Sequence, residues 1–175
     1  MSWEAVRIAL TLAALNDSTV KVLHIYNAYI TAPVKDKIWK FLGREFCEDY
    51  SRKAILARDI YGLKSAGTAF RNHLTDCMYY LEFLPCYVDP YIWMKHMVRP
   101  VYGFKYYTYV LIYVYDVIII HLDAESVLRK LKKCFKLKHS LIGDPDIYLG
   151  AKLKKMRLKN GVCAWANRPA RYVKE

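Results

Sequence analysis

The sequence lacks the features that mark several common classes of protein. Its five cysteines form no CxxC pair and are odd in number, so we expect free thiols in a reducing compartment, the cytoplasm or the nucleus. No segment reaches the roughly 20 apolar residues needed to cross a membrane, because the best candidate, residues 106–122, carries Asp116. P-loops, GxSxG elbows and Cys/His pairs at nucleophile spacing are absent as well. These absences predict an intracellular protein with no membrane segment and none of those three chemistries.

Acidic residues are scarce at one end of the chain. Residues 129–175 hold 14 Lys and Arg residues against 3 Asp and Glu residues, whereas residues 1–128 hold 14 against 13. A one-ended excess of positive charge favours a polyanionic partner such as nucleic acid. The alternative is a solvated basic face that has no partner. The charge of this basic C-terminal part therefore indicates a class of partner but not a site.

What the chain does contain is enough apolar sequence for a folded core. Hydrophobic residues make up 55% and charged residues 25% of its 175 residues, which predicts one globular domain. Helical and strand-like stretches mix without regular alternation, so the predicted class is α+β. Residues 106–121 exceed the length of one strand and predict a hairpin that breaks near Asp116. The other predicted elements are helices over 3–15, 65–83 and 124–135 and strands over 20–25, 38–42, 54–57, 91–95, 148–158 and 162–165.

Four short motifs occur together and in order along the chain. They are IYNAYITAP at 25–33, IYGLKSAGTAF at 60–70, YVYD at 113–116 and YLGAKL at 148–153. Their order and spacing resemble the reverse transcriptase domain of copia-type retrotransposons, and the resemblance covers nearly the whole chain. YGLKSAG is specific for that group, whereas YVYD alone is weak.

The resemblance implies a fold, an activity and partners. The expected fold is a reverse-transcriptase-like palm over 1–175, an antiparallel sheet with helices packed on one face, with fingers and thumb largely missing. The expected activity is RNA-directed DNA polymerisation, which transfers nucleotides to a primer end with Mg²⁺ as cofactor. The expected partners are an RNA template and a DNA primer, and the oligomeric state is left open.

The catalytic residues of the family are mostly replaced in this sequence. Polymerisation uses two divalent cations, which carboxylates from a strand end and a neighbouring hairpin tip must hold. The resemblance places the three aspartates of the family at His24, Tyr115 and Asp116, so that Asp116 is the one metal-binding carboxylate left. Imidazole and phenol are poor ligands for Mg²⁺. We therefore expect a polymerase that is catalytically impaired.

Three explanations of these replacements stay open at this point. Mutational decay fits, because one base change converts an Asp codon into a His or Tyr codon. A softer metal such as manganese or zinc on His24 and Asp116 is the second explanation, although no further His or Cys completes such a site. The third treats Asp116 as an ordinary turn residue. Two other functions are compatible with the sequence, a non-catalytic nucleic-acid-binding module and a decayed transposon remnant.

The resemblance also assigns nucleotide-binding and nucleic-acid-binding residues. Tyr29 is expected to lie under the sugar of the incoming nucleotide, and glycine allows a backbone to approach a base pair closely. The expected nucleotide-binding residues are Tyr29, Gly62, Lys64 and Ser65. The expected nucleic-acid-binding residues are Tyr148, Leu149, Gly150, Lys152, Lys154 and Lys155. The alternatives are core positions for the aromatic residues and solvated surface charges for the lysines.

Overall fold

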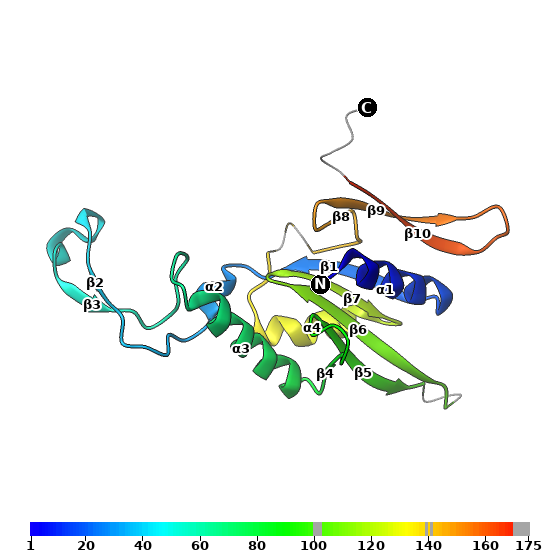
Figure 1. The fold of residues 1–175 in the computed structure, drawn as a ribbon, viewed down its shortest axis with the longest axis horizontal. Coiled ribbons are helices and arrows are strands. Elements are labelled where there is room, and N and C mark those ends of the chain that lie inside the picture. The colour runs from blue at the N-terminus through cyan, green and yellow to red at the C-terminus, as the bar shows by residue number, and fades with distance from the viewer. Residues whose placement is uncertain (100–102, 139, 141, 170–175) are drawn as a thin grey trace. The chain divides into compact units, whose positions relative to one another are not determined.

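The computed structural model describes residues 1–99, 103–138, 140 and 142–169 of the chain. The chain divides into two compact units, the first made of Met1–Tyr26 with Met78–Glu175 and the second of Asn27–Cys77. The first unit contains the main sheet and two of the helices (Figure 1). The expectation of a single domain over 1–175 stays a prediction.

A five-stranded antiparallel sheet is the centre of the first unit (Figure 1). Its strands lie in the order β1-β7-β6-β5-β4, and each neighbouring pair is antiparallel. The bounds are β1 Thr19–His24, β4 Leu84–Pro85, β5 Ile92–Val98, β6 Lys105–Tyr113 and β7 Asp116–His121. The mixed α+β class and the hairpin that breaks near Asp116 are confirmed.

Helix α1 (Trp3–Leu15) covers one face of this sheet. The side chain of Ser2 begins the helix, because its Oγ accepts a hydrogen bond from the Ala5 amide at 3.1 Å. Apolar residues recur every three or four positions and meet the even-numbered residues of β1 and β7. The buried residues at this contact are Val6, Ala9, Leu10, Ala13, Val20, Leu111, Ile118 and Ile120.

Helix α4 (Ala124–Cys134) packs against β7 and β1 from the other side of the sheet. Alternate residues of a strand point to opposite faces, so the buried Val117 and Ile119 face away from α1. The predicted arrangement, with helices on one face, is therefore wrong. The reason is that β7 is apolar at nearly every position, and such a strand needs cover on both faces.

A second antiparallel sheet follows α4, with the order β10-β9-β8. Its strands are β8 Ile147–Tyr148, β9 Ala151–Arg157 and β10 Cys163–Pro169. The predicted strand 148–158 is interrupted, because Leu149 and Gly150 take positive φ angles of 47° and 76° and form a turn. A turn at Gly161 connects β9 to β10, with the Gly161 amide donating to the Leu158 carbonyl at 2.9 Å.

The second unit holds short elements and most of one long helix. The hairpin of β2 (Trp39–Phe41) and β3 (Lys53–Ile55) overlaps the two strands predicted over 38–42 and 54–57. The predicted helix 65–83 is observed as α3, Ala66–Tyr80, whose last residues belong to the first unit. Two short helices, α2 (Ala28–Thr31) and the 3-10 helix η1 (Arg44–Asp49), were not predicted.

The five cysteines are free thiols, as the sequence predicts. Among the helices of the described residues, none is both long enough and apolar enough to cross a membrane.

The last residue of β7, His121, is a buried histidine held by two partners. Its Nδ1 accepts a hydrogen bond from the Asp123 amide at 2.7 Å, and its Nε2 lies 3.4 Å from the hydroxyl of Tyr106. Burial lowers the pKa of His121 below its ordinary value of 6.5, although Asp123 acts in the opposite direction. The folded protein therefore holds this ring in its neutral form.

The lowered pKa of His121 predicts that the folded protein loses stability in mild acid. Below about pH 6.5 the unfolded chain binds a proton at this position before the folded chain does, so stability is complete above that pH and falls as the pH is lowered. The His121→Gln variant keeps an acceptor for the Asp123 amide but does not titrate. We expect it to lose less free energy of unfolding than the parent between pH 7.5 and 5.5, as measured by urea unfolding. Equal losses in the two proteins would contradict the assignment.

Candidate active site

A strand end and a hairpin tip meet at one end of the main sheet. His24 closes β1 and is paired in register with Asp116, the first residue of β7. Their side chains join, with His24 Nδ1 lying 3.0 Å from Asp116 Oδ1. The rings of His24 and Tyr115 lie 4.5 Å apart between centroids, and the Ile25 amide donates to the Tyr115 carbonyl at 2.9 Å. The structure thus brings together the three positions that the sequence predicted to converge.

A tight turn fixes Asp116 at the tip of the β6–β7 hairpin. Tyr113 pairs with Asp116, so only Val114 and Tyr115 connect the strands. Val114 has a φ angle of 55°, a region that β-branched residues rarely adopt and that costs about 1–2 kcal/mol. Two-residue hairpin loops need such angles because their twist must match that of the strands. The requirement for a tight hairpin therefore outweighs the preference of valine.

The paired residues open into a cleft of about 290 Å³. His24 and Asp116 are partly exposed there, at 25% and 33% of their side-chain surface. The opposite wall comes from the segment before and within β8, including Ser140, Gly143, Asp144, Asp146 and Tyr148. Tyr148 is buried, and its hydroxyl donates to the sulfur of Met1 at 3.8 Å. Burial, followed by the charge of Asp116, raises the pKa of Tyr148, so its phenol stays neutral.

Two carboxylates in this cleft were missed by the sequence reasoning. Asp144 and Asp146 are the only acidic residues between positions 129 and 169, a signal that could have drawn attention to them. Each is largely exposed and paired with a lysine, Asp144 with Lys21 at 2.9 Å and Asp146 with Lys152 at 3.8 Å. Both carboxylates are thus already paired with lysines.

The donor atoms at the strand end do not fit two magnesium ions. Magnesium prefers oxygen ligands in octahedral geometry, whereas this end offers one carboxylate, one imidazole and one phenol. An oxygen of that carboxylate is already bonded to His24. Across residues 1–99, 103–138, 140 and 142–169, no three His, Cys, Asp or Glu side chains are grouped so that they could hold a metal ion.

A family model described as reverse transcriptase (RNA-dependent DNA polymerase) matches residues 1–165 of the chain. The chain belongs to this reverse transcriptase family. No curated protein matches it, and no solved structure does. The match includes the main sheet, most of the second sheet and the residues at the His24–Asp116 end, so the family-level part of the sequence prediction is confirmed.

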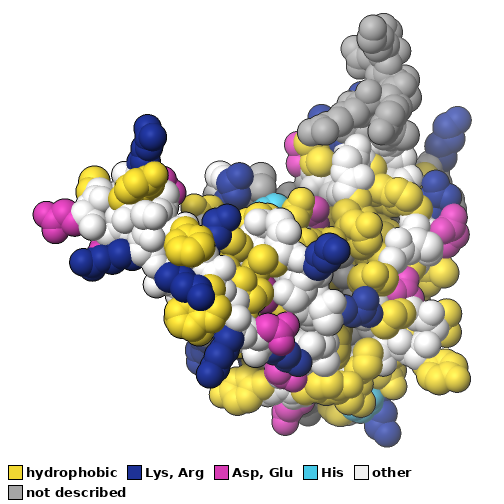
Figure 2. All heavy atoms as spheres, turned by 60° about the vertical axis from the view of Figure 1, so that its left-hand side comes forward, with side chains coloured by type: hydrophobic (Ala, Val, Ile, Leu, Met, Phe, Trp, Pro, Cys, Tyr) yellow, Lys and Arg dark blue, Asp and Glu magenta, His cyan; other side chains and the backbone are white. Residues whose placement is uncertain are grey.

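The lysines predicted to bind nucleic acid do not share one face in this reverse transcriptase domain. Lys152 and Lys154 lie on the outer face of β9, and Lys152 is paired in register with Arg168 of β10. Lys155 lies on the other face, where its amine is 3.5 Å from the carboxylate of Asp17. Lys and Arg side chains are dispersed over the face in Figure 2, so overall charge alone does not locate a contact. The outer face of β9–β10 therefore carries Lys152 and Lys154 but not Lys155.

The predicted nucleotide-binding residues belong to the second unit of the domain. The ring of Tyr29 packs edge-on against Tyr61, with centroids 4.8 Å apart, and against Phe70, with centroids 6.0 Å apart. Gly62 has a φ angle of 97°, which favours glycine, and Lys64 is exposed. The roles assigned to these residues, to Ser65 and to the residues of the cleft stay predictions.

Asp59 is a third acidic residue that the sequence analysis did not single out. Its side chain is fully buried in the second unit, and its Oδ1 accepts a hydrogen bond from the Ser65 hydroxyl at 3.3 Å. Its other oxygen, Oδ2, has no hydrogen-bond partner among the described residues. A buried oxygen without a partner loses its hydration without compensation, so Asp59 destabilises the unit.

Removing the charge of Asp59 should stabilise the protein. The Asp59→Asn variant keeps the size of the side chain and the acceptor for Ser65 but puts an amide nitrogen without a partner in the place of Oδ2, so we expect it to raise the free energy of unfolding by about 1 kcal/mol. Asp49→Asn is the matched control, because Asp49 is an exposed residue of the same unit and its change is expected to stay within about 0.5 kcal/mol. Urea unfolding at pH 7 measures both. Destabilisation by Asp59→Asn would mean that the carboxylate has a partner in solution.

Proposed function

We propose that this chain is the reverse transcriptase domain of a copia-type retrotransposon, with a palm-like first unit and an impaired polymerase. The observation that carries the proposal is the hydrogen bond between His24 and Asp116 at the end of β1 and β7. In the family this place needs carboxylates that hold two cations, and only one carboxylate remains. The architecture of a polymerase site is therefore kept while its chemistry is reduced.

The ligands of this site argue against efficient nucleotidyl transfer. One aspartate that is already bonded to a histidine cannot position two cations a few Å apart. Manganese or zinc accepts imidazole more readily than magnesium does, so residual activity with manganese is the alternative to complete loss. Both outcomes agree with an ancestral enzyme that has lost two of its three metal-binding aspartates.

Primer extension tests this proposal directly. With an oligo(dT) primer on poly(A), we expect no extension by the parent chain above background in magnesium, and at most a trace in manganese. The double variant His24→Asp/Tyr115→Asp is assayed beside it. Primer extension by this variant also depends on fingers and thumb, so only a strong gain in extension is informative. Robust extension by the parent chain with magnesium would overturn the proposal.

Restored cation binding is a more sensitive measurement than restored activity. In His24→Asp/Tyr115→Asp, three carboxylates meet at the strand end, so bound magnesium should stabilise the fold by up to about 2.7 kcal/mol at 100 times its dissociation constant. His24→Asn/Tyr115→Asn is the matched control, because it makes similar changes in size without carboxylates. We expect magnesium, at constant ionic strength, to raise the unfolding temperature of the Asp variant alone. Equal shifts of the unfolding temperature in the two variants would show that the strand end is not the metal site.

A second function, binding of nucleic acid without catalysis, is favoured by the outer face of β9–β10. Lys152, Lys154 and Arg168 lie on that face, and Lys154 has no ion-pair partner within the part of the chain that the structure describes. A row of cations at strand spacing matches the regular spacing of backbone phosphates. We propose an RNA template paired with a DNA primer as the ligand, met in the cytoplasm or the nucleus.

Salt dependence identifies this binding. Affinity for an RNA–DNA hybrid should fall steeply with salt, and Lys152→Ala/Lys154→Ala should reduce the slope of log K against log salt by about 1.8, the value for two phosphate contacts. Lys155→Ala is the matched control, since that lysine faces the other way and is paired with Asp17. We expect the control to change the slope by less than half as much. Binding that is insensitive to salt, or equal effects of the two variants, would exclude this face.

A further inference from the structure

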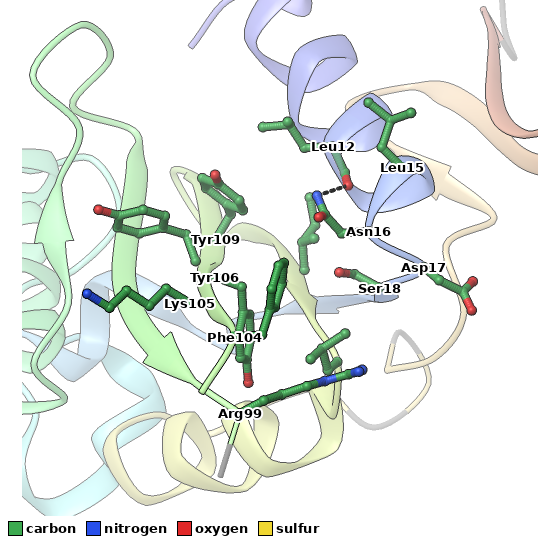
Figure 3. A pocket seen from close by; sticks show the side chains of 13 residues that line it. Leu12, Leu15, Asn16, Asp17, Ser18, Arg99, Phe104, Lys105, Tyr106 and Tyr109 are labelled. Atoms are coloured by element: carbon green, nitrogen blue, oxygen red, sulfur yellow. Dashed lines mark hydrogen bonds between the residues drawn. The ribbon is translucent and has the colours of Figure 1, made fainter. Parts of the chain in front are cut away.

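A second hollow, larger than the cleft at His24, lies at the other end of β1. Thr19 is paired with His121 there, five residues away from the pair of His24 and Asp116. The hollow has a volume of about 600 Å³ and is formed by the end of α1, by Arg99 and by residues of β6 and β7 (Figure 3). Pockets that bind small molecules measure about 300–1,000 Å³, so this one has room for a molecule the size of a mononucleotide.

Aromatic rings form one wall of the hollow, and two of them are about half exposed. Phe104 and Tyr107 expose 55% and 50% of their surface. The rings of Tyr107 and Tyr109 lie 6.3 Å apart between centroids at an angle of 37°. Burial raises the pKa of Tyr109 above its ordinary value of 10, so this part of the wall is uncharged. Exposed ring faces of this kind are suited to stacking against a flat, unsaturated ring.

The charges around the hollow are distributed unequally. Arg99 and Lys105 lie beside the aromatic wall, and neither forms an ion pair with the described residues. On the side of α1, Asn16 donates its amide to the Leu12 carbonyl at 2.8 Å, which leaves its Oδ1 as an acceptor. Figure 3 shows Asn16 and Arg99 on opposite sides of the space. One side thus favours an anion, and the other favours a hydrogen-bond donor.

We propose that this hollow binds a planar aromatic anion of mononucleotide size. Its ring lies over Tyr107 and Phe104, its anionic group meets Arg99, and an amino group on the ring donates to Asn16 Oδ1. The site uses none of the residues of the His24–Asp116 end and does not rest on the proposed function. It is therefore a second ligand site rather than part of a polymerase centre.

Adenosine monophosphate is the probe for this site, with its two halves as separate ligands. By calorimetry on the full chain, we expect adenosine monophosphate to bind about tenfold more tightly than adenosine, which lacks the phosphate, or than ribose 5-phosphate, which lacks the ring. Inosine monophosphate, which lacks the amino group, should bind more weakly too. Equal binding of inosine monophosphate would overturn the assigned orientation. Absence of binding at millimolar concentration would overturn the site.

Matched variants locate the binding. Arg99→Gln and Tyr107→Leu should each weaken binding of adenosine monophosphate about five- to tenfold. Their controls are Arg129→Gln, at an exposed arginine of α4, and Tyr87→Leu, at a fully exposed tyrosine outside the hollow. The controls should bind as the parent does. Equal losses in variants and controls would overturn the site.

Photoaffinity labelling of the parent chain tests the site without relying on the folding of any variant. Photolysis of 8-azidoadenosine monophosphate bound to the parent chain should modify residues 12–18 or 104–109, identified by mass spectrometry. Competition by adenosine monophosphate should suppress that labelling, whereas inorganic phosphate should not. Labelling confined to the cleft at His24 and Asp116, or spread along the chain without competition, would overturn the proposal.

Discussion

The antiparallel register between β1 and β7 is the constraint on which the rest of the first unit depends. The same ladder places Val20 and Ile118 under α1 and places His24 opposite Asp116. Side chains alternate along a strand, so a slip of one residue would turn Lys21 toward the core and separate His24 from Asp116. One set of backbone hydrogen bonds therefore fixes both the core and the candidate site. A change of register that disrupts the geometry of the site also disrupts the core.

Local sequence signals account for most of the secondary structure. The hairpin of β6 and β7 follows from a long run rich in Tyr, Val and Ile with one polar break at Asp116, and α1 follows from Ser2 and the helical spacing after it. The break between β8 and β9 did not follow, because Leu149 takes a positive φ angle that leucine rarely adopts. The apolar run within β7 is a sequence signal for cover on both faces of the sheet, but the expected arrangement followed the family resemblance instead.

Sequence signals likewise predicted one part of the candidate site and missed another. Motif order was enough to predict that His24, Tyr115 and Asp116 converge, because they lie at a strand end and a hairpin tip. The pairing of Lys21 with Asp144 joins residues 123 positions apart, and nothing local announces it. Lys154 and Lys155 are neighbours in sequence and must point to opposite faces of a strand, so the lysines predicted to bind nucleic acid do not all share one face. Sequence thus located the site but not the partners of its charges.

The contact between His24 and Asp116 also has a consequence for the fold. An ionised carboxylate only accepts hydrogen bonds, so in the contact of 3.0 Å the ring nitrogen of His24 is the donor to Asp116. A second carboxylate in its place would face the first at short range, and without cations that repulsion would oppose the pairing of β1 with β7. Histidine removes the repulsion and adds a bond across the ladder. Under the proposal that His24 replaces a metal-binding aspartate, the same change stabilises the metal-free sheet, so activity can be lost without loss of the fold.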